Sequence, residues 1–245
     1  MKTLGSSTTT CLLILGAVIL AASASAQTRA PIFDQIAKTY GLDSYDKIDA
    51  IRYTFALDVP GLFSVTRSWE WHPKTGEVTF DGKGKDGKPV KVTYNRNQLS
   101  SQSADVKTDI DPGFINDNYW LIFPFHAYWD KSATITDDGM QKLPTGTGTA
   151  RRVVVKYPSE SGGYSPGDTW ELFVGSDNRI QAMRFHHGGS VKPSLVIATW
   201  TGYKKAGPLL VSTDHRGTAD GKPLKLLLQN VAVKLAGSDT WLKAQ

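Results

Sequence analysis

The histidines of this sequence are its first candidates for binding a metal ion, and their spacing argues against such a site. His186 and His187 are adjacent in the segment FHHGGS, and neighbouring residues on a strand point to opposite faces, so both cannot easily bind one metal ion. His72, His126 and His215 are far apart along the chain, and no H-x-x-x-H or H-E-x-x-H pattern is present. We therefore predict that the protein binds no metal and no cofactor.

Motifs for covalent catalysis are missing as well. The chain has no G-x-S-x-G nucleophile elbow, and the glycine-rich segment SGGYSPG is not placed between a strand and a helix, as a phosphate-binding loop would be. Nothing in the spacing of the carboxylates pairs two of them across a cleft. The sequence thus favours a protein that is not an enzyme and has no catalytic residues. The enzymatic alternative is an exported hydrolase that uses His126, His186 or His215.

Aromatic residues give the stronger signal. In the segment NDNYWLIFPFHAYWD, residues 116 to 130, every position from Tyr119 to Phe125 is apolar. In the segment FSVTRSWEWHP, Arg67 lies in phase with Trp69 and Trp71, so that it could supply a polar group to an apolar pocket. The predicted ligand-binding residues are Arg67, Trp69, Trp71, Tyr119, Trp120, Phe123, Phe125 and Trp129. The alternatives are that the rings form only a large aromatic core and that Arg67 is a solvated charge.

The apolar segment is predicted to be a short helix. Asp111 is a plausible N-cap with Pro112 at the first helical position, and Pro124 should kink or end the helix near Phe123. A helix of about two to three turns that is apolar all round is buried on all sides. We expect it to lie inside the concavity of a single curved sheet.

Most of the remaining chain alternates between apolar and polar residues, as strands do. In the first half this holds for the segments KIDAIRYTFALDV, FSVTRSWEWHP, EVTFDG and PVKVTYN, and in the later half for ARRVVVKYP, DTWELFVG, NRIQAMRFHH, SLVIATWTGY, LLVSTDHRG and KLLLQNVAVKL. The segment DGKGKDGK, residues 81 to 88, predicts a hairpin turn. A calcium loop there is excluded, because Val92 stands where such a loop needs a glutamate. With one short helix over residues 30 to 40, this pattern predicts an antiparallel sheet.

The N-terminal residues have the features of a secretory signal peptide. Lys2 supplies the positive charge, an apolar run extends from Cys11 to Ala22, and Ala24-Ser25-Ala26 forms a small-x-small cleavage site. We predict a signal peptide over residues 1–26 and a single domain over residues 27–245. The mature chain would then start at Gln27 and be periplasmic or secreted.

Composition limits the partners of the mature chain. The apolar run is shorter than the roughly 20 residues that span a bilayer, so we expect no integral membrane segment. The net charge of +5 is too mild for a dedicated nucleic-acid binder. The only cysteine lies in the predicted signal peptide and precedes the place of a lipidated cysteine, so we expect neither a disulfide nor a lipid anchor.

Three segments, FINDNYWLIFPFHAYWD, GGYSPGDTWELFVGSDNRIQAMRFHHGG and ATWTGYKKAGPLLVSTDHRG, resemble a group of exported bacterial proteins described as similar to outer-membrane lipoprotein-sorting proteins, the LolA/LolB-like fold. The resemblance implies a mainly β (α+β) fold, in which a strongly curved antiparallel sheet forms an incomplete barrel and short helices close its concave side. Carriers of that fold hold lipid acyl chains in a hydrophobic cavity.

The resemblance therefore implies a periplasmic, non-enzymatic carrier or binder of a lipid, a lipoprotein acyl chain or a similar apolar ligand. Its partner would be a hydrophobic small molecule, a lipid or an acylated protein, and we expect a monomer. The non-enzymatic alternative is a structural or interaction module whose interior is filled by its own aromatic side chains.

Overall fold

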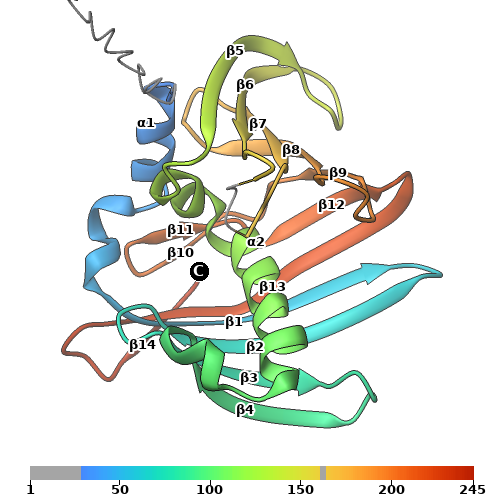
Figure 1. Cartoon of the computed structure of the whole chain (residues 1–245). Coiled ribbons are helices and arrows are strands. Elements are labelled where there is room, and N and C mark those ends of the chain that lie inside the picture. Colours follow the sequence, from blue (N-terminus) through green and yellow to red (C-terminus); the bar gives the residue numbers. More distant parts are fainter. Residues whose placement is uncertain (1–28, 161–163) are drawn as a thin grey trace, which may run out of the picture.

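The computed structural model describes residues 29–160 and 164–245, and Figure 1 shows their arrangement. The predicted signal peptide over residues 1–26 and its cleavage site lie outside these residues. The described chain forms a large antiparallel sheet, and the long helix α2 (Asp111–Trp129) crosses one of its faces.

The large sheet has 12 strands in the order β4-β3-β2-β1-β13-β12-β9-β8-β7-β6-β5, with β14 paired to β13. β10 and β11 form a separate two-stranded ribbon. The strands are β1 (Ile48–Val59), β2 (Phe63–His72), β3 (Glu77–Lys83), β4 (Pro89–Asn95), β5 (Thr134–Lys142), β6 (Thr149–Lys156), β7 (Thr169–Val174), β8 (Ile180–His186), β9 (Leu195–Thr199), β10 (Lys204–Ala206), β11 (Leu209–Val211), β12 (Asp214–Ala219), β13 (Lys222–Leu235) and β14 (Trp241–Lys243).

The predicted alternation is confirmed in the strands. In β1, Ile51, Tyr53 and Phe55 are buried, whereas Arg52 and Thr54 between them are partly exposed. Successive residues of a strand point to opposite faces, so one face of the sheet is apolar and packs on α2. The predicted hairpin over residues 81 to 88 is also confirmed, because it joins β3 to β4.

The sheet curves without closing into a barrel. β4 and β5 form its two ends, and within the described ranges they do not pair with each other. Figure 1 shows the strands β5 to β8 turning over α2, while β1 to β4 lie on its other side. The predicted fold class, an incomplete barrel with helices on its concave side, is confirmed.

Short helices lie beside the sheet. The predicted N-terminal helix is confirmed as α1 (Ile32–Thr39), which buries Phe33, Ile36 and Ala37. Two 3-10 helices, η1 (Leu42–Lys47) and η2 (Arg96–Ser101), follow α1 and β4, and a π-helical turn, η3 (Val106–Ile110), leads directly into α2.

The prediction for the start of α2 was wrong. Asp111 is not an N-cap, because the chain is already helical in η3 and at Ile110. Its carboxylate accepts hydrogen bonds from β4 and η2 instead, from the Tyr94 hydroxyl at 2.9 Å and from Arg96 Nε at 2.7 Å. These contacts satisfy the carboxylate more strongly than a local capping bond would, since one donor is charged.

The kink expected near Phe123 is confirmed, but the expected length of two to three turns was wrong, because the helix continues beyond the kink to Trp129. Pro124 marks a kink rather than an end, and Ile122 has non-helical dihedral angles of φ −133° and ψ 35°. Proline lacks the N–H that would bond to residue 120, which weakens the turn before it. Packing on both sides of the kink keeps the two halves helical. The expected burial on all sides is confirmed for the apolar segment from Tyr119 to Phe125, and it extends to the polar residues Asp117 and Asn118.

Candidate functional site

The helix α2 bridges the two limbs of the curved sheet. Its N-terminal half contacts β2, where the Phe114 ring lies 5.5 Å from that of Trp69 and 5.6 Å from that of Trp71, between ring centroids. Its second half contacts β7, where Phe123 stacks on Trp170 at 4.2 Å. A single helix thus separates the apolar face of the sheet into two aromatic groups.

An ion pair ties α2 to the β2 side. Arg67 donates from Nε to Asp117 Oδ2 at 2.7 Å and from an Nη to Oδ1 at 2.6 Å, and Trp69 Nε1 donates to Oδ2 at 2.8 Å. The Asp117 side chain is fully buried, and burial raises the pKa of its carboxyl although Arg67 and Trp69 act in the opposite direction. Arg67, predicted as a polar group of an apolar pocket, is therefore not a solvated charge but the partner of a buried carboxylate on the helix.

A second carboxylate fastens the start of α2. The Asp111 contacts described above come from β4 and η2, and Arg96 also donates to the Tyr164 hydroxyl at 2.8 Å. The Arg96 guanidinium lies 5.3 Å from the centroid of the Phe114 ring. Desolvation and the neighbouring Asp111 raise the pKa of Tyr94, which keeps its hydroxyl a donor.

Trp120, in the middle of α2, belongs to a cluster of large rings from several elements. Trp120 stacks on Trp200 at 5.8 Å and contacts Trp170 at 6.1 Å and His215 at 5.4 Å. Trp200, which sequence analysis did not select, follows β9 and lies 4.4 Å from His215. Among the described residues, the indole N–H groups of Trp170 and Trp200 have no hydrogen-bond acceptor although they are buried.

The remaining predicted residues lie toward the C-terminal end of α2. Tyr119 stacks on His126 at 4.2 Å, whereas Phe125 and Trp129 contact Tyr45 at 5.3 and 4.8 Å. Trp129 is 39% exposed, unlike the other aromatic residues of the set. The structure therefore distributes the eight predicted residues along the helix and its two walls, rather than around one point. The role of Asp117 was missed and Asp111 was considered only as an N-cap, although an acid two residues before the apolar run from Tyr119 to Phe125 is a signal that the sequence does contain.

The three histidines of the enzymatic alternative lie in three different places. Burial lowers the pKa of His126 to about 3 and that of His215 to about 4, so both rings are neutral near pH 7. His126 Nε2 lies 2.7 Å from Asn118 Oδ1, and His215 Nδ1 donates to the Thr199 carbonyl at 3.2 Å. His186 is on the outer side, 3.0 Å from Glu171. Within the described residues, no group of three or more His, Cys, Asp and Glu side chains could hold a metal ion.

The space between α2 and the sheet is occupied by these rings in this structure. A pocket of about 910 Å³ lies on the opposite, outer face of the sheet, over β1, β2 and β13, and another of about 430 Å³ lies beside α1. A ligand between helix and sheet would therefore require α2 or the rings to move. No helix in the described part of the chain is long and apolar enough to cross a membrane.

Comparison with known proteins finds similarity in solved structures alone, since no protein-family model and no curated protein matches the sequence. A DUF1329 family protein from Desulfovibrio piger has 10% identity and a TM-score of 0.44, with 85% of this chain and 94% of that chain covered. A domain described as an outer-membrane lipoprotein-sorting protein from Vibrio parahaemolyticus has 10% identity and a TM-score of 0.45, with 84% and 93% covered. A LolA-superfamily protein from Nitrosomonas europaea has 9% identity and a TM-score of 0.43, with 82% and 93% covered.

These neighbours include the kind of protein that the sequence segments resemble, so the expected resemblance is confirmed. At such identities and TM-scores, the function has to be argued from the residues of this chain.

Proposed function

We propose that the protein is an exported, non-enzymatic binder of an acyl chain or a similar apolar ligand, which enters between α2 and the curved sheet. The proposed domain spans residues 27–245 and acts as a monomer, and α2 is its lid. The observation that carries this proposal is the position of α2. Its residues from Asp117 to Phe125 are all buried against an open sheet, and its N-terminal half is fastened by two carboxylates, Asp111 and Asp117.

The open sheet allows α2 to move. Because β4 and β5 do not pair within the described chain, lifting the helix breaks no strand pairing. Lifting must break the contacts of Asp117 with Arg67 and Trp69, and those of Asp111 with Tyr94 and Arg96. The kink at Ile122 divides the helix, so that one half can move while the other stays packed.

The surface uncovered in this way suits an apolar ligand. It consists of the rings of Trp69, Trp71, Trp170 and Trp200 on the sheet side, with neutral His215 beside them. An acyl chain would take the place of α2 on this surface, and each methylene that it buries would contribute about 0.8 kcal/mol to the free energy of binding. The unpaired indole N–H groups of Trp170 and Trp200 could donate to a ligand carbonyl or carboxylate, since a buried donor gains from any acceptor. A lipid or an acylated protein supplies both the apolar chain and the carbonyl or carboxylate oxygen.

A second candidate is a structural or interaction module with a self-filled core. It is favoured by the close ring contacts between α2 and the sheet, such as 4.2 Å between Phe123 and Trp170. In that case α2 is part of the core and never leaves it.

Native mass spectrometry of protein purified from its own host distinguishes the two candidates. The proposal predicts an adduct with the mass of a lipid or fatty acid, which organic extraction removes and which returns when fatty acid is added. A bare protein mass before and after the addition of fatty acid would contradict the proposed binding and favour the self-filled core.

A further inference from the structure

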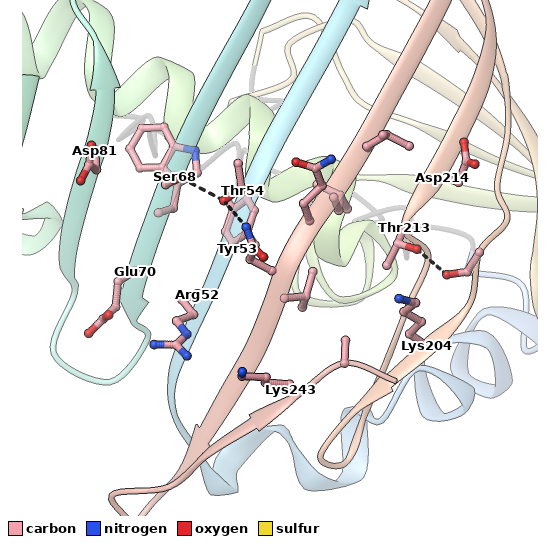
Figure 2. Close-up of a pocket in the computed structure, with 18 of the residues that line it drawn as sticks. Arg52, Tyr53, Thr54, Ser68, Glu70, Asp81, Lys204, Thr213, Asp214 and Lys243 are labelled. Atoms are coloured by element: carbon pink, nitrogen blue, oxygen red, sulfur yellow. Dashed lines mark hydrogen bonds between the residues drawn. The ribbon is translucent and has the colours of Figure 1, made fainter. Parts of the chain in front are cut away.

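The pocket on the outer face of the sheet has no part in the proposed lid. Its floor is formed by β1, β2 and β13, and residues of β10 and β14 form one wall (Figure 2). The floor is polar: Thr54 and Ser68 share a hydrogen bond of 2.9 Å, and the Asn230 amide donates to Thr54 at 3.4 Å. We call this pocket the outer groove.

Carboxylates that line the outer groove already have partners. Asp214 accepts from Arg216 Nε at 2.9 Å, and Asp81 lies 3.6 Å from Lys91 Nζ. Glu70 lies 3.4 Å from the His72 ring.

Three cations of the groove, in contrast, have no carboxylate within ion-pair distance among the described residues. They are Arg52, Lys204 and Lys243. Arg52 stands opposite Glu70 in the strand register, but its guanidinium lies instead over the Trp241 ring, 4.3 Å from the centroid. The cation–π contact directs the guanidinium toward β14 and away from β2.

The register of the strands brings these cations together. Arg52 on β1 is opposite Ala232 on β13, and Ala232 is opposite Lys243 on β14. Residues directly opposite each other point to the same face, so Arg52 and Lys243 stand in one row about 10 Å apart, with a methyl group between them. Lys204 adds a third cation farther along the groove: Lys205 and Gln245 exchange two backbone hydrogen bonds that place β10 beside β14, so that Gly207 rather than Lys204 is opposite Lys243. In Figure 2, Lys243 projects over β13, whereas Lys204 lies to the right of that strand, below Thr213.

We infer that the outer groove is a binding site for a phosphate ester that carries hydroxyl groups, such as a glycerol phosphate. A phosphate has enough charge and enough acceptor oxygens to engage Arg52 and Lys243 from two sides, and Lys204 adds a third positive charge to the same groove. The hydroxyl groups of the ligand would bond to Thr54, Ser68 and Asn230 on the floor. The ligand is either a free small molecule or the headgroup of a phospholipid, since both present the same chemistry.

Isothermal titration with glycerol 3-phosphate tests the site. The mature protein should bind it, and the double change Lys204→Gln and Lys243→Gln should weaken binding at least tenfold. Both lysines are exposed, so the variant should melt at the parental temperature. The change Lys204→Arg with Lys243→Arg should keep most of the affinity. Lys222→Gln, at the distant end of β13, is the matched control and should bind as the parent does.

Vesicles identify the source of the phosphate. Binding to phosphatidylglycerol vesicles that is lost in the Gln double variant would assign a lipid headgroup, whereas binding to free glycerol 3-phosphate without vesicle binding would assign a soluble ligand. A parent that binds neither probe, or a double variant that binds as well as the parent, would overturn the inference. Either result leaves the proposed acyl-chain site untouched, because that site lies on the other face of the sheet.

Discussion

Arg67 on β2 and Asp117 on α2 form a two-point ion pair, with donor–acceptor distances of 2.7 and 2.6 Å, across the boundary between the sheet and the helix that covers it. Asp117 is fully buried and Arg67 has 22% of its side chain exposed, so the pair is shielded from solvent on the helix side. Removing one member of such a pair leaves the other charge without its partner in a place that water scarcely reaches. The pair therefore links α2 to the β2 limb of the sheet through a contact that is costly to break on one side only.

Replacing Asp117 by Asn should lower the free energy of unfolding by at most roughly 3–5 kcal/mol, because Arg67 would stay largely covered without its counter-charge. Urea denaturation of the parent and the variant measures this. Asp109→Asn in η3 is the control, since Asp109 lies 3.9 Å from Lys85 near the surface and should contribute less than about 1 kcal/mol. Equal effects of the two changes would show that the Arg67–Asp117 pair does not hold the helix.

The buried histidine His215 predicts a loss of stability in acid. Its ring takes up a proton near pH 6.5 in the unfolded chain, but burial lowers its pKa to about 4 in the folded protein. The unfolded state therefore binds more protons between these two values, so stability falls as the pH falls through this window, by roughly 3 kcal/mol in full.

The change His215→Gln tests this, because glutamine does not take up a proton in this pH range but keeps a side-chain donor for the Thr199 carbonyl. Urea denaturation at about pH 7 and at about pH 4.5 should show a smaller acid loss in the variant than in the parent. His126, whose pKa is also lowered, and Asp117, whose pKa is raised, are present in both proteins and cancel in the comparison. An identical pH dependence in both would contradict the neutral buried state of His215.

Replacing two aromatic residues of α2 by alanine distinguishes a ligand-binding site from a packed core. If Trp120 and Phe123 line a site that α2 covers, Trp120→Ala and Phe123→Ala should weaken the binding of a fluorescent fatty-acid probe. If they are core alone, each change should cost roughly 3–5 kcal/mol of stability with no probe binding to lose. Probe titration and urea denaturation of the same samples give both quantities. Variants that unfold easily, from a parent that never bound the probe, would refute the ligand site.

Removal of metal should leave the protein unchanged. Treatment with a chelator is expected to give the parental melting temperature, because four of the five histidines bond to Asn118, Glu171, Pro193 and Thr199 rather than converge, and His72 lies apart from them beside Glu70. A fall of several degrees that zinc reverses would show a metal site and contradict this prediction.

The fold was predictable because its strands are locally consistent. Alternation such as Ile51, Tyr53 and Phe55 against Arg52 and Thr54 specifies a half-buried strand without knowledge of its neighbours. The burial of α2 followed from its apolar residues in the same way. Its length did not, because the weak turn at Pro124 is held by rings that approach from β7 and η1, and such contacts are not visible in a local pattern.

The candidate site was predictable only in part. Arg67 was selected because it shares a face with Trp69 and Trp71, and the structure places it on that face. Its partner Asp117 lies 50 residues away, and one sequence does not show which acid on the helix meets which strand. Trp200 and His215 were missed as neighbours of Trp120 for the same reason, since they come together through the order of the strands.

Hydrogen exchange of the α2 amides tests the central claim, that α2 is a lid, most directly. If α2 lifts from an intact sheet, the amides of residues 111 to 129 should exchange through an opening that requires far less free energy than global unfolding, while those of β1 and β13 exchange only on global unfolding. Asp117→Asn should make this opening easier, and a saturating long-chain fatty acid should change the exchange of α2 while β1 and β13 keep their pattern. Amides of α2 that exchange only with those of β1 and β13, with and without fatty acid, would contradict the lid and make α2 a part of the core.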